Sequence, residues 1–196
     1  MLMDLSILDA DEIFQLALNL VSDNQHAEAI ALLKDGATRY RSDARLHYLL
    51  GAEYAQIGLY DRAAESLETA AALDPSLHMA VFQLGLLRLT QGQPDKAISA
   101  WKGLDGLEDT SALPHFRKGL EHLIADEFDA CRDSLKKGME INTALPALNH
   151  DMQQILDRVD AASAPQPAAA EEAQPAPATG SLFMRGYAGH DDSTRH

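Results

Sequence analysis

The feature that most constrains the fold of this chain is a sequence repeat of 34 residues. Three glycines mark the repeat, and a small residue follows each of them twelve positions later: Gly51, Gly85 and Gly119, then Ala63, Ala97 and Cys131. Extending the register backwards places Ala17 and Ala29 at the same two positions. A period of this length is typical of a solenoid, in which no repeat buries its apolar face alone. We therefore predict four copies, over residues 10–43, 44–77, 78–111 and 112–145.

The second copy identifies the type of repeat. It resembles the tetratricopeptide repeat through a series of residues at the expected spacing: Leu50, Gly51, Tyr54, Gly58, Tyr60, Ala63, Ala70 and Pro75. The third copy departs from the pattern, and its second helix is expected to end early, at Gly103 or Gly106. Apolar residues three and four apart, with no strand-like alternation, also favour helices. The resemblance implies an all-α fold, a right-handed solenoid of helical hairpins.

The two ends of the repeat array carry further signals. Asp9 and Glu12 have the spacing of a capping box at the start of the first helix. Residues 146–161 place apolar residues on one side and are interpreted as a capping helix, so the solenoid domain is predicted to span residues 1–161. Residues 162–196 are rich in Ala, Pro, Gln and Glu, and we predict a disordered tail.

The tail contains a short apolar motif at residues 182–187. Its large side chains are Leu182, Phe183, Met184 and Tyr187. An apolar segment within a polar tail is a candidate docking motif, and the alternative is a chance cluster.

The sequence contains no pattern that predicts chemistry. It has no phosphate-binding loop, no zinc-protease motif, no paired cysteines and no dinucleotide fingerprint, so we expect no enzyme, no cofactor and no metal site. Cys131 occupies a small-residue position, and His47, His115 and His122 occupy aromatic positions; all four are interpreted as packing residues. The formal net charge of −14 argues against a nucleic-acid partner. No apolar run is long enough for a membrane span, and the acidic N-terminus is unlike a signal peptide, which predicts a cytoplasmic protein.

The resemblance also implies where a partner would bind. In this family, positions 2, 5, 9, 12 and 13 of each first helix line a concave groove, and an aromatic residue recurs at position 5 of every copy. The candidate groove residues are Phe14, Leu18, Arg45, Tyr48, Gln56, Met79, Phe82, Leu86, Phe116 and Leu120. They predict a client with an apolar segment, with Arg45 available for one acidic group. The lysines and asparagines of the family's carboxylate clamp are absent. Packing between repeats, or the capping helix, is the alternative that would bury part of this face.

We therefore expect a protein-interaction adaptor or chaperone that binds an apolar peptide or helical segment, in secretion or in complex assembly. The alternative is a structural scaffold that forms homo-oligomers through the same apolar face. A further hypothesis is that the 182–187 motif folds back into the groove and competes with a client.

Overall fold

The helices of the computed structural model begin at the same interval as the sequence repeat. The structure describes residues 7–163. The first helices of the successive copies are α1 (Ala10–Ser22), α3 (Ala44–Gln56), α5 (His78–Thr90) and α7 (Ala112–Ile124). The second helices are α2 (His26–Arg39), α4 (Tyr60–Leu73), α6 (Pro94–Trp101) and α8 (Phe128–Ile141), and α9 (Pro146–Ser163) begins one interval after α7. No strand occurs within the described range, so the predicted all-α fold is confirmed.

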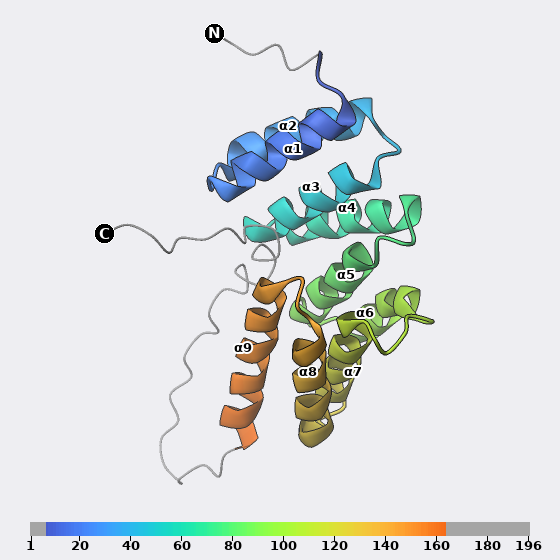
Figure 1. Ribbon diagram of the computed structural model, residues 1–196, viewed down its shortest axis with the longest axis vertical. Helices are drawn as coiled ribbons and strands as arrows, with labels where there is room; N and C mark the ends of the chain where they lie inside the picture. The colour runs from blue at the N-terminus through green and yellow to red at the C-terminus, as the bar shows by residue number, and fades with distance from the viewer. Residues whose placement is uncertain (1–6, 164–196) are drawn as a thin grey trace, which may run out of the picture.

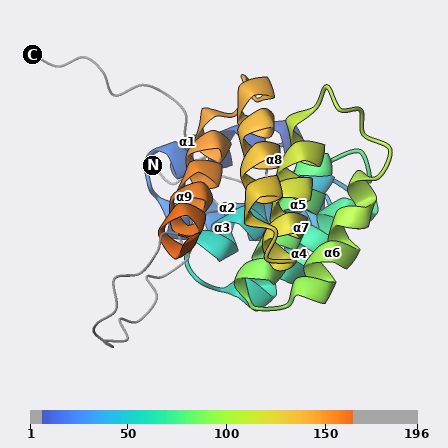
Figure 2. The same ribbon diagram turned by 90° about the horizontal axis from the view of Figure 1, so that it is seen from below.

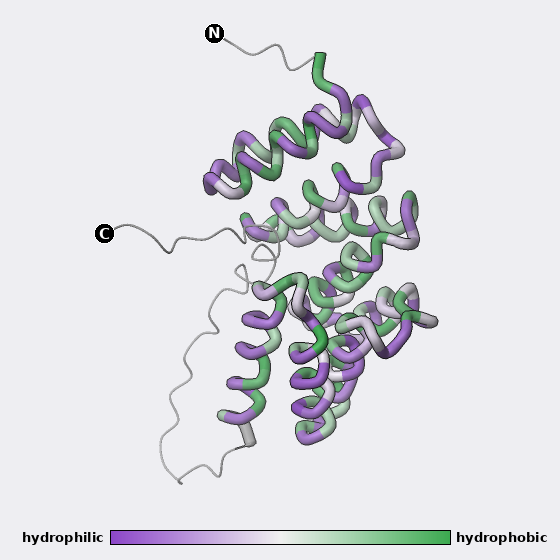
Figure 3. Tube along the Cα trace, in the orientation of Figure 1, coloured by the Kyte–Doolittle hydropathy of each residue, from purple (hydrophilic) through white to green (hydrophobic). Residues whose placement is uncertain are grey.

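The helices stack in chain order along one axis. Each first helix packs against its own second helix, and α2, α4, α6 and α8 also contact the helix that follows them. Figure 1 shows α1 and α2 at one end of the molecule and α7, α8 and α9 towards the other. In the view of Figure 2, α9 lies beside α8 on the side away from α6. This arrangement is a solenoid, and Figure 3 shows its helices with hydrophobic and hydrophilic residues on different faces.

The repeated glycines allow the two helices of a copy to approach closely. A Cβ atom on Gly85 would lie 2.0 Å from Nε1 of Trp101, and one on Gly119 would lie 2.5 Å from Cδ2 of Leu135. The indole of Trp101 is fully buried, and its Nε1–H donates a hydrogen bond of 3.0 Å to the carbonyl oxygen of Phe82. The recurrence of glycine in the second, third and fourth copies therefore has a steric origin, because a Cβ there would overlap the large residue of the opposite helix.

The third copy has a shortened second helix, as its sequence predicts. Helix α6 has 8 residues, whereas α4 has 14. Its α-helical part ends at Trp101 and a single 3₁₀ turn, η2 (Lys102–Leu104), follows. Gly106 then adopts a φ of +87°, which side chains disfavour. The chain leaves the helix here and forms a long connection to α7.

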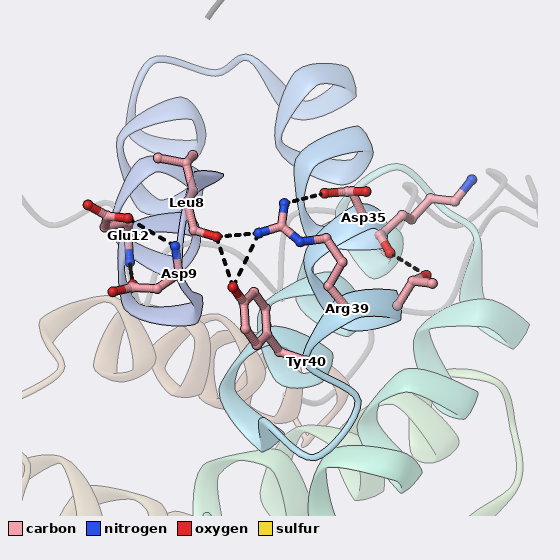
Figure 4. Close-up of polar contacts among 8 residues, drawn as sticks. Leu8, Asp9, Glu12, Asp35, Arg39 and Tyr40 are labelled. Carbon is pink, nitrogen blue, oxygen red and sulfur yellow. Dashed lines mark hydrogen bonds and ion pairs between the residues drawn. The ribbon is translucent and has the colours of Figure 1, made fainter. Parts of the chain in front are cut away.

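Polar contacts hold the N-terminal end of α1 against the end of α2. The predicted capping box is confirmed: Asp9 Oδ1 accepts from the Glu12 backbone at 2.9 Å, and Glu12 Oε2 accepts from the Asp9 backbone at 2.9 Å. Just before it, the carbonyl oxygen of Leu8 accepts hydrogen bonds from Arg39 and from the Tyr40 hydroxyl, the latter at 2.9 Å (Figure 4). The last turn of α2 therefore fixes the point at which the chain enters the solenoid.

Helix α9 covers the C-terminal end of the array with one apolar side. Leu148, Met152, Leu156 and Val159 are buried. Figure 3 shows the hydrophobic side of α9 turned towards α8. Because α9 begins one interval after α7, it occupies the place of the first helix of a fifth copy. Within the described residues no second helix follows it. The predictions for the tail, including its 182–187 motif, lie outside the described residues.

Candidate functional site

The structure divides the ten predicted groove residues into two groups. Five of them remain at least partly exposed: Phe14, Leu18, Arg45, Gln56 and Met79. The other five are buried: Tyr48, Phe82, Leu86, Phe116 and Leu120. The accessible residues lie on α1, α3 and the first turn of α5, whereas Phe116 and Leu120, the predicted groove residues of α7, are buried. We call Phe14, Leu18 and Met79 the N-terminal inner face.

The expectation of four exposed aromatic rings along a groove is therefore corrected. Phe82 and Phe116 are 0% exposed, and their ring centroids lie 6.3 Å apart. Phe82 also stacks on Trp101 at a centroid distance of 6.4 Å. These rings belong to the core between α5, α6 and α7. Packing between repeats buries them, and the buried side chains Tyr48, Leu86 and Leu120 are likewise unavailable to a ligand in this conformation.

Phe14 lies under the guanidinium group of Arg45, whose central carbon is 5.4 Å from the ring centroid. Nη2 of Arg45 is 2.7 Å from Oδ1 of Asp11 and 2.6 Å from Oδ2 of Asp43. Hydrogen bonds to Asp43 and Asp11 raise the pKa of Arg45, and the bond to Arg45 lowers the pKa of Asp43. The charge of Arg45 is already compensated by two carboxylates, so the structure does not favour a client carboxylate as its partner.

Two amide oxygens lie close to the accessible side chains in helix register. Oε1 of Gln56 and Oε1 of Gln83 are shielded from solvent, and neither has a hydrogen-bond partner among the described residues. Gln83 follows Met79 by four positions on α5 and therefore lies on the same side of that helix. Sequence reasoning did not select Gln83 as a groove residue, although it is the one amide within the apolar run of α5. A ligand that supplied N–H donors would satisfy these oxygens only if the two side chains first turned outward.

A buried carboxylate connects the first two copies. Glu53 of α3 is 0% exposed, and its Oε2 lies 2.9 Å from Nδ1 of His26, the first residue of α2. Burial raises the pKa of Glu53, and the contact with His26 opposes that change. Oε1 of Glu53 has no partner among the residues that the structure describes. This pair joins α2 to α3 and belongs to the structural core.

The other residues considered for chemistry have structural contacts. Nε2 of His47 donates to the carbonyl oxygen of Arg41 at 3.1 Å, and Nε2 of His115 donates to that of Asp109 at 2.9 Å. These histidines occupy the same repeat position and both hold the turn that precedes their helix. Cys131 is buried, and burial raises the pKa of its thiol, which is the opposite of an activated nucleophile.

Residues 7–163 contain neither a metal-binding cluster nor a helix that could cross a membrane. No group of three or more His, Cys, Asp or Glu side chains there is placed to hold a metal ion. In the same range, every helix is too short or too polar to cross a bilayer.

Comparison with known proteins identifies the repeat. A family model described as tetratricopeptide repeat matches residues 14–78 and 48–102. A curated relative, the small glutamine-rich tetratricopeptide repeat-containing protein 2 of Saccharomyces cerevisiae, is 23% identical over 142 residues, which make up 72% of this chain and 35% of the relative. The chain thus spans about a third of the length of that relative.

Solved structures show the same fold. MamA residues 41-end from Desulfovibrio magneticus RS-1 align with a TM-score of 0.58 at 19% identity, over 78% of this chain and 84% of the other. The Pseudomonas aeruginosa pilF structure aligns with a TM-score of 0.59 at 18% identity, over 81% of this chain and 78% of the other. At these identities the likeness establishes the architecture alone.

Proposed function

Because this chain is a tetratricopeptide repeat protein, we propose that it is an adaptor or chaperone that holds an apolar segment of a client protein on the N-terminal inner face. Such solenoids act through the extended surfaces that their stacked repeats create. The observation that supports this location is the partial exposure of Phe14, Leu18 and Met79. The counterparts of Phe14 and Leu18 further along the array are buried. Apolar side chains that remain accessible on a soluble protein are available to a partner.

The size of this face sets the expected affinity. Complete burial of a large apolar side chain contributes about 1.5 to 3 kcal/mol, and these three are already partly covered, so their gain is roughly half of that each. The sum is about 2 to 5 kcal/mol, before the cost of ordering a peptide. Backbone donors that reach Gln56 or Gln83 would add to it. We therefore expect reversible binding with a dissociation constant of about 0.2 mM or weaker from these side chains alone.

Affinity purification from native extract tests the proposal. The bait variant Leu18→Glu, Met79→Glu places two charges on the N-terminal inner face, and the control Ile57→Glu, Leu73→Glu places two charges at exposed apolar residues elsewhere. We expect a client that the wild type and the control recover and the double variant loses, with helix content unchanged in all three.

Recovery of the same proteins by the Leu18→Glu, Met79→Glu variant would refute this location. Light scattering on the same variants examines the alternative scaffold function. A stable wild-type dimer that this double variant dissociates would assign the face to self-association instead of client binding.

A further inference from the structure

We propose that the N-terminal inner face is the docking site of the chain's own segment Leu182–Tyr187, which thereby competes with a client. This inference rests on the proposed function, because both concern the same face. The segment lies outside the described residues, and its sequence, the accessible side chains and the length of the intervening chain support the assignment.

The segment has the composition that this face requires. Leu182, Phe183, Met184 and Tyr187 are large and apolar, and they follow a stretch of Ala, Pro, Gln and Glu. The partly exposed side chains of the face are also aromatic or flexible and apolar, namely Phe14, Leu18 and Met79. Methionine and aromatic side chains adapt to one another's shape and bury a large area for their number. Contact between the two sets would remove apolar surface on both from water.

Charge and hydrogen bonding would also orient the segment on this face. Arg185 is the only Lys or Arg between Arg158 and Arg195, in a chain of net charge −14. Beside Phe14, the side chain of Asp11 is 76% exposed although one of its oxygens pairs with Arg45. It therefore remains accessible to a second cation such as Arg185. An extended segment also presents backbone N–H groups. Oε1 of Gln56 and Oε1 of Gln83 would accept from them only after their side chains turn outward, because both oxygens are shielded from solvent.

The intervening chain is long enough for docking within one molecule. Residues 164–181 can span about 60 Å when extended. They begin at the end of α9, which is about 27 Å long and points away from α1 (Figure 1). Returning along α9 leaves about 30 Å, and neighbouring helices stand about 10 Å apart. The remaining length covers two such spacings, from α9 past α7 to α5, and the segment's own extended length of about 20 Å extends the reach towards α1.

A labelled peptide of residues 180–190 tests the proposal against two proteins, the full chain and a chain ending at residue 163, which retains the whole described core. We expect saturable binding to the shorter chain and at least tenfold weaker binding to the full chain, because a tethered segment has a high effective concentration. In the full chain, Phe183→Glu should restore peptide binding to within about twofold of the shorter chain. In the shorter chain, Leu18→Glu with Met79→Glu should abolish binding, whereas Ile57→Glu with Leu73→Glu should leave it unchanged.

Three outcomes would overturn the inference: no saturable binding to the shorter chain, equal binding to both proteins, or loss of binding in the Ile57→Glu, Leu73→Glu control. If the full chain's own segment competes less well with the peptide when the full chain is diluted, the segment docks on a second copy of the chain instead of on its own. The client purification separates this inference from the proposed function. A client that depends on Leu18 and Met79 without peptide binding refutes only the docking, and peptide binding without such a client refutes only the adaptor function.

Discussion

Replacing Gly85 by Ala should destabilise the solenoid, although alanine is the better helix former. In a helix interior this change alone would stabilise by about 1 kcal/mol. The added Cβ, however, would lie 2.0 Å from Nε1 and 2.4 Å from Cδ1 of Trp101, so the indole must move by more than 1 Å from a fully buried position. Overpacking of this kind costs about 1 to 3 kcal/mol.

The displaced indole also loses a hydrogen bond. Its Nε1–H donates to the carbonyl oxygen of Phe82 at 3.0 Å, and a buried donor left without a partner costs a further 1 to 3 kcal/mol, roughly. Combined with the gain in helix propensity, the expected loss is about 3 kcal/mol. At Gly51 the nearest obstacle to a Cβ is Cγ of Leu67 at 2.8 Å, which is a smaller overlap than at Gly85. Gly51→Ala should therefore cost no more than about 1 kcal/mol.

Urea unfolding followed by far-ultraviolet circular dichroism measures both variants and the wild type under one set of conditions. A double-mutant cycle with Trp101→Leu provides the control, since the penalty at Gly85 should fall to near zero when the indole is absent. Two results would refute the reasoning: a Gly85→Ala protein as stable as the wild type, or a penalty that persists unchanged in the Trp101→Leu background.

Three further variants test other features of the structure. Phe82→Glu should unfold the third copy, visible as lost helix signal, because it buries a charge at a 0% exposed position; Leu18→Glu should keep the wild-type signal. Glu53→Gln should raise the melting temperature at neutral pH. Because burial raises the pKa of Glu53, this carboxyl group stabilises the fold fully below pH 4.5, its ordinary pKa, and the stabilisation is lost as the pH rises. The gain from Glu53→Gln should therefore be larger at neutral pH than in acid, and a larger gain in acid would contradict the reasoning. Tyr40→Phe should cost about 1 kcal/mol and speed hydrogen exchange at the start of α1, and unchanged exchange would argue against the anchoring contact.

Much of the fold follows from residue spacing that is visible in the sequence. The 34-residue interval, the capping box at Asp9 and the early end of the third copy's second helix all reappear in the structure. Each is a local property: a small residue at a helix contact, a side chain that reaches its own backbone, or a glycine that ends a helix. Such signals do not depend on how the repeats are placed relative to one another.

The candidate site was predicted less well. At position 5 of each copy the sequence shows a large aromatic residue, and Phe14 and Phe82 are indistinguishable by that criterion. The structure leaves Phe14 partly exposed and buries Phe82 completely against Trp101 and Phe116. An apolar side chain satisfies a groove and a core equally, so the pattern could not separate the two environments.

The sequence by itself determined that this chain forms stacked helical pairs, because helix periodicity and close glycine contacts act between neighbours in the chain. Only the tertiary structure decided which inner positions remain accessible, because exposure depends on the angle and separation of successive repeats. The same holds for the ion pair of Arg45 with Asp11, because Asp11 belongs to the preceding helix pair. Contacts of that kind exist only once the repeats are assembled.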